Sequence, residues 1–168
     1  MNLIVTSDGI LRAGDRAYTC AIGRGGFRDD KREGDGGTPI GTYYLKQVYY
    51  RPDRQSAPET RLPAQALTPR DGWCDDPADP AYNRMVTLPF DASHEKMWRD
   101  DGLYDVVIEI SHNDNPPIPG EGSAVFIHIA KPDFAPTEGC VALAKPDLLA
   151  ILKSVSTDSQ IVIQPPKV

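Results

Sequence analysis

The sequence predicts a mainly β fold with one or two short helices, formed by a single domain over residues 1–168. Of its 168 residues, 40% are apolar, which is enough for one domain with a hydrophobic core. The 14 glycines and 16 prolines indicate many turns. Between the turns, short segments rich in β-branched and aromatic residues recur, as in a chain of short strands.

The predicted strands follow the chain from its start. Two turn pairs, Asp8-Gly9 and Gly14-Asp15, separate the opening strands of a meander, which are Leu3–Thr6, Ile10–Ala13 and Ala17–Ala21. A polar, glycine-dense loop over residues 23–37 comes next. The later predicted strands are Thr42–Tyr50, Asp105–Ile110, Ala124–Ile129 and Gln160–Gln164, all rich in residues that favour β-structure.

Two segments favour short helices. Lys145-Pro146-Asp147 suits a helix start, because proline is tolerated in the first turn and aspartate complements the dipole there. Four apolar residues then give the helix a buried face: Leu148, Leu149, Ile151 and Leu152. Ala92–Asp100 is the second predicted helix, with His94 on its surface. Residues 51–84 are rich in proline and charge and are expected to be irregular, which in a compact domain often accompanies function.

Charge and cysteine content exclude several classes of function. The net charge is −6, which argues against a broad phosphate-binding surface and so against a nucleic-acid partner. Three cysteines, Cys20, Cys74 and Cys140, cannot form a complete disulfide framework. No C-x-x-C pair favours zinc, and no metal or other cofactor is expected. The glycine-rich loop, with Arg24, Lys31 and Arg32, lacks the spacing of a phosphate-binding loop.

The sequence also bears on a signal peptide and on membrane-spanning helices. The opening residues 1–9 lack a basic segment followed by a long apolar stretch, so no signal peptide is expected. No apolar run approaches the roughly 20 residues of a membrane-spanning helix. A cytoplasmic chain and one separated from its leader both fit these observations.

Cys140 and His128 are the candidates for chemistry. His128 lies in the apolar segment Phe126–Ile129, where an imidazole needs a partner, and Cys140 follows twelve residues later, directly after Gly139. An imidazole beside a thiol helps to deprotonate it. A glycine next to a nucleophile lets the backbone approach a substrate and offers amides to an oxyanion. Buried structural roles for both residues remain the alternative.

The segment around Cys140 resembles the catalytic motif of the L,D-transpeptidase (YkuD-domain) family. In that family a strand histidine is followed by Ser/Thr-x-Gly-Cys, here Thr137-Glu138-Gly139-Cys140, and Thr38-Pro39-Ile40-Gly41 resembles an upstream Thr-Pro-x-Gly element. The resemblance covers most of the chain. It implies a YkuD-like β-sandwich of mixed sheets and no cofactor.

The resemblance also implies a role for each motif residue. Cys140 would be the nucleophile, which carbapenems acylate in this family, and His128 its base. The backbone carbonyl of Ile129 would orient the imidazole, and amides around Gly139 and Cys140 would form the oxyanion hole. Thr137 would contact substrate.

This chain departs from the family pattern at three points. Many members have a second histidine where Glu138 stands and Arg or Asn where Ala142 stands, and the usual spacing from histidine to cysteine is longer. We therefore interpret Glu138 and the segment 73–84 as the places where substrate contacts differ. The candidates there are Trp73, Asp75, Asn83 and Arg84, of which Arg84 suits a carboxylate and Asp75 an amine. His112 is the rival base, because geometry decides such a pairing.

The function implied is peptidoglycan cross-linking by a monomeric, metal-independent acyltransferase in the periplasm or cell envelope. Its partners would be peptidoglycan stem peptides, joined by a 3-3 link between diaminopimelates or a 1-3 link from L-Ala. Two alternatives stay open: an L,D-carboxypeptidase or endopeptidase that uses water as acceptor, and a non-enzymatic wall-binding module.

Overall fold

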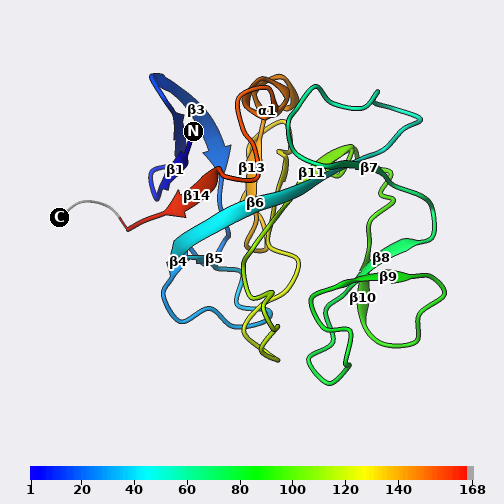
Figure 1. Cartoon of the computed structure of the whole chain (residues 1–168). Helices are drawn as coiled ribbons and strands as arrows, with labels where there is room; N and C mark the ends of the chain where they lie inside the picture. Colours follow the sequence, from blue (N-terminus) through cyan, green and yellow to red (C-terminus); the bar gives the residue numbers. More distant parts are fainter. Residues whose placement is uncertain (166–168) are drawn as a thin grey trace.

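The computed structural model describes residues 1–165 and is mainly β with one short α-helix in that range, as predicted (Figure 1). The strands are β1 (Leu3–Thr6), β2 (Ile10–Ala13), β3 (Arg16–Ala21), β4 (Phe27–Arg28), β5 (Thr38–Pro39), β6 (Gly41–Tyr50), β7 (Ala64–Ala66), β8 (Asp71–Cys74), β9 (Met85–Thr87), β10 (His94–Lys96), β11 (Val106–Ile110), β12 (Phe126–Ile129), β13 (Val141–Leu143) and β14 (Gln160–Ile163). The helix α1 (Lys145–Leu152) lies between β13 and β14. Every strand expected from the sequence is present, with ends shifted by no more than two residues.

The main sheet closes on itself and forms the expected mixed-sheet sandwich. Its strands follow the order β11-β12-β13-β3-β2-β1-β14-β6-β7, and β6 also pairs with β11. The long strand β6 closes the ring because its first half pairs with β14 and its second half with β11. Parallel pairs β1–β14, β12–β13 and β6–β7 stand among antiparallel ones. Closure leaves few free strand edges.

Alternating side chains place the two candidate residues on one face of this sheet. In β12 and β13 the residues Ile127, Val141 and Leu143 belong to the main core, inside the sandwich. Their neighbours point the other way, because side chains alternate along a strand. Phe126 and Cys140 accordingly belong to a second buried cluster on the opposite face. The strands that carry the chemistry thus separate the main core from the site.

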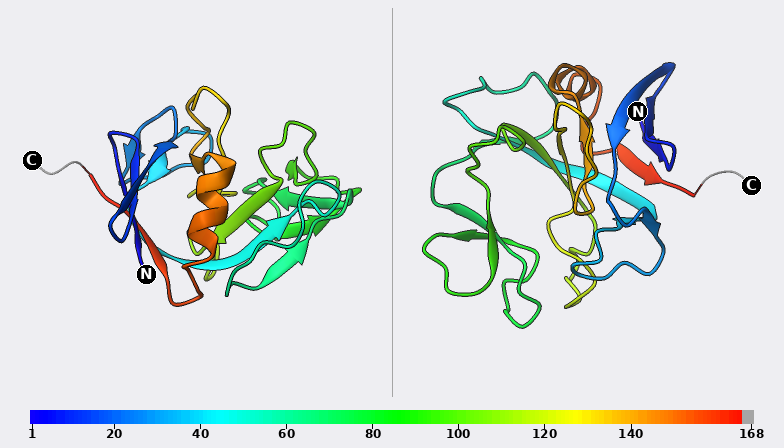
Figure 2. Two further views of the ribbon diagram at one scale, coloured as in Figure 1. Left: turned by 90° about the horizontal axis from the view of Figure 1, so that it is seen from above. Right: turned by 180° about the vertical axis from the view of Figure 1, so that it is seen from behind.

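Helix α1 forms where the sequence predicts it. Pro146 stands in its first turn and Asp147 is the acidic residue there, while Leu148, Ile151 and Leu152 are buried in the main core. Seen from above, α1 lies between the N-terminal strands and the sheet of β6 and β11 (Figure 2, left). No helix among residues 1–165 is long and apolar enough to cross a membrane.

The predicted helix over Ala92–Asp100 is wrong. His94–Lys96 instead form β10, which pairs with β8 in a three-stranded sheet completed by β9. Met97, which follows directly, is fully buried in the second cluster. A nine-residue helix is marginal by itself, so strand pairing and this burial override its weak propensity. Residues 51–84, expected to be irregular, also contain the strands β7 and β8. Strands this short show no detectable alternation of polar and apolar residues in the sequence.

Candidate active site

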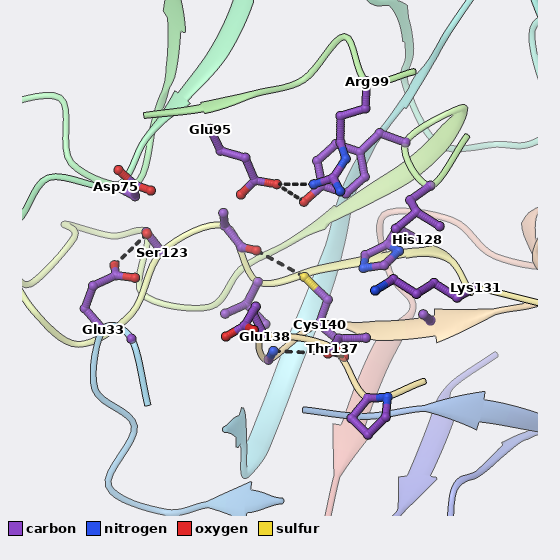
Figure 3. Close-up of a pocket in the computed structure, with 18 of the residues that line it drawn as sticks. Glu33, Asp75, Glu95, Arg99, Ser123, His128, Lys131, Thr137, Glu138 and Cys140 are labelled. Atoms are coloured by element: carbon purple, nitrogen blue, oxygen red, sulfur yellow. Dashed lines mark hydrogen bonds and ion pairs between the residues drawn. The ribbon is translucent and has the colours of Figure 1, made fainter. Parts of the chain in front are cut away.

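The second cluster borders a cavity of about 390 Å³ that opens between the main sheet and the three-stranded sheet. Cys140 and His128 both line it (Figure 3). Thr137, Glu138 and Gly139 form the side next to the sulfur, and Glu95 stands on the wall that comes from β10. A cavity of this size is typical of sites for small ligands or a few peptide residues.

Strand register brings Cys140 and His128 together. Ala142 is the Cα partner of His128 in the parallel pair β12–β13, and Cys140 precedes Ala142 by two residues, which returns it to the same face. One strand spacing across and two residues along give a Cα separation of about 8 Å. Both side chains point to one face and line the same cavity, so a twelve-residue interval in sequence becomes proximity across neighbouring strands.

The Cys140 thiol is held by two backbone groups. The Phe126 amide donates to Sγ at 3.3 Å, and the thiol donates to the Ala124 carbonyl at 3.2 Å. Burial raises the pKa of the thiol to about 12, and the Phe126 amide opposes that rise by favouring the thiolate. Without substrate, Cys140 is therefore a buried, protonated thiol.

His128 is oriented for a single role by its backbone partner. Its Nδ1 lies 2.8 Å from the Ile129 carbonyl, which can only accept, so Nδ1 carries the hydrogen and Nε2 keeps its lone pair. The ring packs against Tyr104 in an edge-type arrangement, with centroids 5.4 Å apart. Burial lowers the pKa of His128 to about 4, although the Ile129 carbonyl acts in the opposite direction. The ring is thus a neutral imidazole with one basic nitrogen.

The Thr-Pro-x-Gly element and the cysteine motif are in direct contact. The Thr38 hydroxyl, fully buried, accepts from the Gly23 amide at 2.8 Å and donates to the Gly139 carbonyl at 2.9 Å. A side chain at Gly139 would place its Cβ 2.8 Å from the Gly37 carbonyl, and Gly139 has φ = +141°. Glycine is therefore required before Cys140 by both space and backbone conformation.

Thr137 folds the motif into a tight turn. Its hydroxyl donates to the Cys140 carbonyl at 2.6 Å and accepts from the Gly139 amide at 3.0 Å. The Gly139 amide, expected as an oxyanion donor, is thus engaged within its own loop. The amide of Cys140 is the other donor that the motif offers to an oxyanion.

These features meet in one recognisable domain. A family model described as the L,D-transpeptidase catalytic domain, YkuD, matches residues 3–163. The chain belongs to the L,D-transpeptidase catalytic-domain family. None of the curated proteins compared with it matches significantly.

Three solved structures are similar to this chain at low sequence identity. The helical cell shape determining protein Pgp2 from Campylobacter jejuni is 15% identical, with a TM-score of 0.52 over 99% of this chain and 48% of that one. L,D-transpeptidase 1 from Mycobacterium tuberculosis is 12% identical (TM-score 0.44; 98% and 61% covered). An L,D-transpeptidase from Mycobacterium smegmatis is 15% identical (TM-score 0.39; 96% and 57% covered). The chain spans about half the length of these structures.

Two predicted substrate contacts, Glu138 and Asp75, line the cavity. Both lie where this L,D-transpeptidase domain was expected to differ from its family in substrate contacts. Glu138 is 80% exposed and pairs with Arg24 at 2.9 Å, so the position of the family's second histidine carries a rim ion pair. Asp75 accepts from the Ser93 hydroxyl at 2.6 Å. Both carboxylates are available at the cavity rim.

Three other predicted contacts stand outside the cavity lining. Trp73 is buried behind it, where its ring meets the edge of Phe126 and its indole N–H donates to Asn83 at 2.9 Å. Asn83 also accepts from the Ala124 amide at 3.0 Å, so it fixes the residue whose carbonyl receives the Cys140 thiol. Arg84 is exposed.

His112, the rival base, lies in a different cavity. It lines a second space of about 210 Å³ together with Tyr43 and Lys31, while Cys140 lines the first. Its Nδ1 is buried and has no hydrogen-bond partner within residues 1–165. Burial, with the Lys31 charge, lowers the pKa of His112 to about 4. The geometry favours His128 as the partner of Cys140.

Sequence reasoning missed the wall that faces His128. Tyr104 donates to Glu95, and Arg99 lies 3.4 Å from Glu95 and over the Tyr104 ring at 4.8 Å. Burial raises the pKa of Glu95. The three residues come from β10 and from the loop before β11, and only the packing of the small sheet against the large one brings them to the site. No local pattern in the sequence signals this.

Proposed function

We propose that this domain is an L,D-transpeptidase that forms peptidoglycan cross-links through a thioester on Cys140. The observation that carries the proposal is the shared cavity, in which a thiol and an imidazole with a free Nε2 stand on one face of two paired strands. Membership of the L,D-transpeptidase catalytic-domain family supplies the substrate class. Such cross-linking belongs to cell-wall biogenesis and the maintenance of cell shape, with its substrate in the cell envelope.

In the first half-reaction the sulfur attacks the carbonyl carbon of an L-configured residue in a stem peptide, and the thiol proton passes to His128 Nε2. The tetrahedral intermediate collapses, the C–N bond breaks, and the departing D-residue amine takes that proton. A thioester remains on Cys140. In the second half-reaction an amine of a neighbouring stem attacks the thioester carbonyl carbon and gives a proton to His128. The C–S bond then breaks, the new amide is released, and His128 returns the proton to the sulfur.

The resting charges favour a general-base mechanism. With a raised pKa for Cys140 and a lowered pKa for His128, the free domain holds a neutral pair and no thiolate–imidazolium ion pair. Proton transfer therefore accompanies attack on the bound substrate. The hydrogen bond that His128 Nδ1–H donates to the Ile129 carbonyl strengthens as His128 becomes positively charged, which stabilises the transition state.

Product analysis tests the proposal. The purified domain is incubated with a tetrapeptide-bearing muropeptide, and the products are separated by liquid chromatography and mass spectrometry. Cross-linked dimers, absent with Cys140→Ala, are expected, and fragmentation of the dimers distinguishes a 3-3 from a 1-3 link. Tripeptide alone identifies the hydrolytic alternative, an L,D-carboxypeptidase. An unchanged muropeptide contradicts both and leaves a wall-binding module.

The choice of base has its own test. His128→Ala is expected to lower the rate of Cys140 acylation by a carbapenem by about 100-fold or more, as for other general bases. His112→Ala, the matched control, removes the same side chain from the second cavity and is expected to retain most of that rate. The reverse order of the two variants would transfer the role of base to His112.

A further inference from the structure

Lys31 is a buried lysine at the junction of the two cavities. It lines both the cavity of Cys140 and the one of His112, yet its side chain is only 8% exposed. Lysine is almost never buried without a partner, because its charge is costly to desolvate. The position of this charge therefore calls for a structural or chemical reason.

Asp35 holds the Lys31 ammonium in place. Nζ donates to Asp35 Oδ1 at 2.5 Å and to the Arg32 carbonyl at 3.0 Å, which accounts for two of its three N–H groups within residues 1–165. Asp35 in turn accepts from the Gly37 amide at 2.8 Å. Burial opposes ionisation of Asp35, but the bonds from Lys31 and the amides more than offset it and lower its pKa to about 2. The Asp35 carboxylate therefore remains ionised across the physiological range.

This pair lies directly against the nucleophile loop. A Cβ built on Gly139 would be 3.7 Å from Lys31 Nζ and 2.8 Å from the Gly37 carbonyl. The next residue, Thr38, bonds the Gly139 carbonyl. Lys31, Asp35 and the Gly37–Thr38 backbone therefore form a continuous support under the residue that precedes Cys140.

The positive charge of Lys31 favours the thiolate form of Cys140. Among the ionised groups that act on Cys140, Glu95 disfavours the thiolate, whereas Lys31 and Arg99 favour it; His128 is neutral at rest. Arg99 faces two carboxylates, Asp101 at 2.5 Å and Glu95 at 3.4 Å. Lys31 pairs with one carboxylate, Asp35, at 2.5 Å, and the Gly139 amide is engaged by Thr137. Lys31 is thus a cation held close to the motif.

We propose that Lys31 is a positioning residue for Cys140, whose ammonium stabilises the developing thiolate while its bond to Asp35 holds the Gly37–Thr38 backbone against Gly139. The inference rests on the proposed function for its biological meaning, because it deepens the role of the same site. It extends the set of functional residues into the glycine-rich loop.

Alkylation of Cys140 by iodoacetamide tests it. The reagent is neutral, so the Lys31 charge does not steer it, and its rate follows the thiolate fraction. Rates are measured from pH 6 to 10 by peptide-resolved mass spectrometry for the wild type, Lys31→Met, Lys31→Arg and the double variant Lys31→Met/Asp35→Asn. Lys46→Met is the control for loss of an ion-paired lysine elsewhere, since Lys46 pairs with Asp114 at 2.8 Å but lines neither cavity.

Lys31→Met and the double variant are expected to alkylate about tenfold more slowly at each pH, equal to a one-unit rise in thiol pKa. Lys31→Arg keeps the positive charge and Lys46→Met lies outside both cavities, so their alkylation rates are expected to stay within about threefold of the wild type. Threefold corresponds to about half a unit of thiol pKa. The double variant leaves no unpaired buried carboxylate, so it separates charge from folding. Wild-type rates in the folded double variant, or equal slowing by Lys46→Met, would overturn the inference. Because alkylation needs no peptidoglycan, loss of muropeptide turnover with a Lys31-dependent alkylation rate would refute only the proposed function.

Discussion

Thr38 links the two motifs of the site, and replacing it with valine isolates that link. Thr38→Val keeps the size and shape of the buried side chain but removes the hydroxyl that bridges the Gly23 amide and the Gly139 carbonyl. Because Thr38 is fully buried, no water reaches the groups that lose their partner. The variant therefore tests whether the upstream element fixes the nucleophile loop.

The expected cost follows from the two bonds. Each ordinary hydrogen bond contributes about 0.5–1.5 kcal/mol to stability, and a buried amide left unpaired costs about 1–3 kcal/mol. The Gly23 amide loses its acceptor, while the Gly139 carbonyl loses a donor. Thr38→Val should accordingly lower the free energy of unfolding by about 2–4 kcal/mol. Thr38→Ser, which keeps the hydroxyl, should cost about 1 kcal/mol for the lost methyl group.

Urea unfolding followed by tryptophan fluorescence measures both variants. Thr87→Val is the control, because Thr87 is exposed on β9 and should change stability by less than about 0.5 kcal/mol. Carbapenem acylation measured below the unfolding transition reports on the loop itself and should slow in Thr38→Val more than in Thr38→Ser. A valine variant as stable and as fast as the serine variant would refute the link between the motifs.

Further predictions concern backbone, network and pH. Gly139→Ala should abolish acylation and destabilise the fold, because its Cβ meets a carbonyl of the neighbouring loop at 2.8 Å. Gly26→Ala, whose Cβ has no atom within 4 Å, should cost only the backbone strain of about 1 kcal/mol. Urea melts and acylation rates compare the two variants. Asn83→Ala should cost about 2–4 kcal/mol in the same melts, since it leaves several buried polar groups unpaired, and a loss under 1 kcal/mol would contradict the network. Both His112 and His128 have a pKa lowered to about 4, so the unfolded chain binds more protons between about pH 6.5 and 4 and stability should fall as pH falls through that window. His112→Gln should flatten this slope relative to the wild type, and an unchanged slope would count against the buried neutral ring.

The strands and the core of the motif were accessible from sequence because their signals are local. β-branched segments between turn pairs located β1 to β3, β6, β11, β12 and β14. His128 and Cys140 were identified as the candidate pair from sequence, whereas the strand β13 and its parallel pairing with β12, which place both residues on one face, emerged only in the structure. Resemblance added the Thr-Pro-x-Gly element, whose contact with Gly139 the structure displays.

The remainder of the site depends on long-range packing that no local pattern encodes. The segment of β10 resembled a helix because its sequence is short and mixed, and its partners in β8 lie some twenty residues earlier. Glu95 and Tyr104 reach the cavity only after the three-stranded sheet packs against the large one. Asn83 was predicted to contact substrate, but a polar side chain in a buried turn instead satisfies the backbone around Ala124.

The central claim is that Cys140 is the acylated nucleophile, and peptide-resolved mass spectrometry after exposure to a carbapenem tests it most directly. The domain has three thiols, at Cys20, Cys74 and Cys140, so the position of the adduct decides between them. The account predicts one adduct, on the peptide that contains Cys140, and none in Cys140→Ala. No adduct on the wild type, or an adduct that persists in Cys140→Ala, would contradict it.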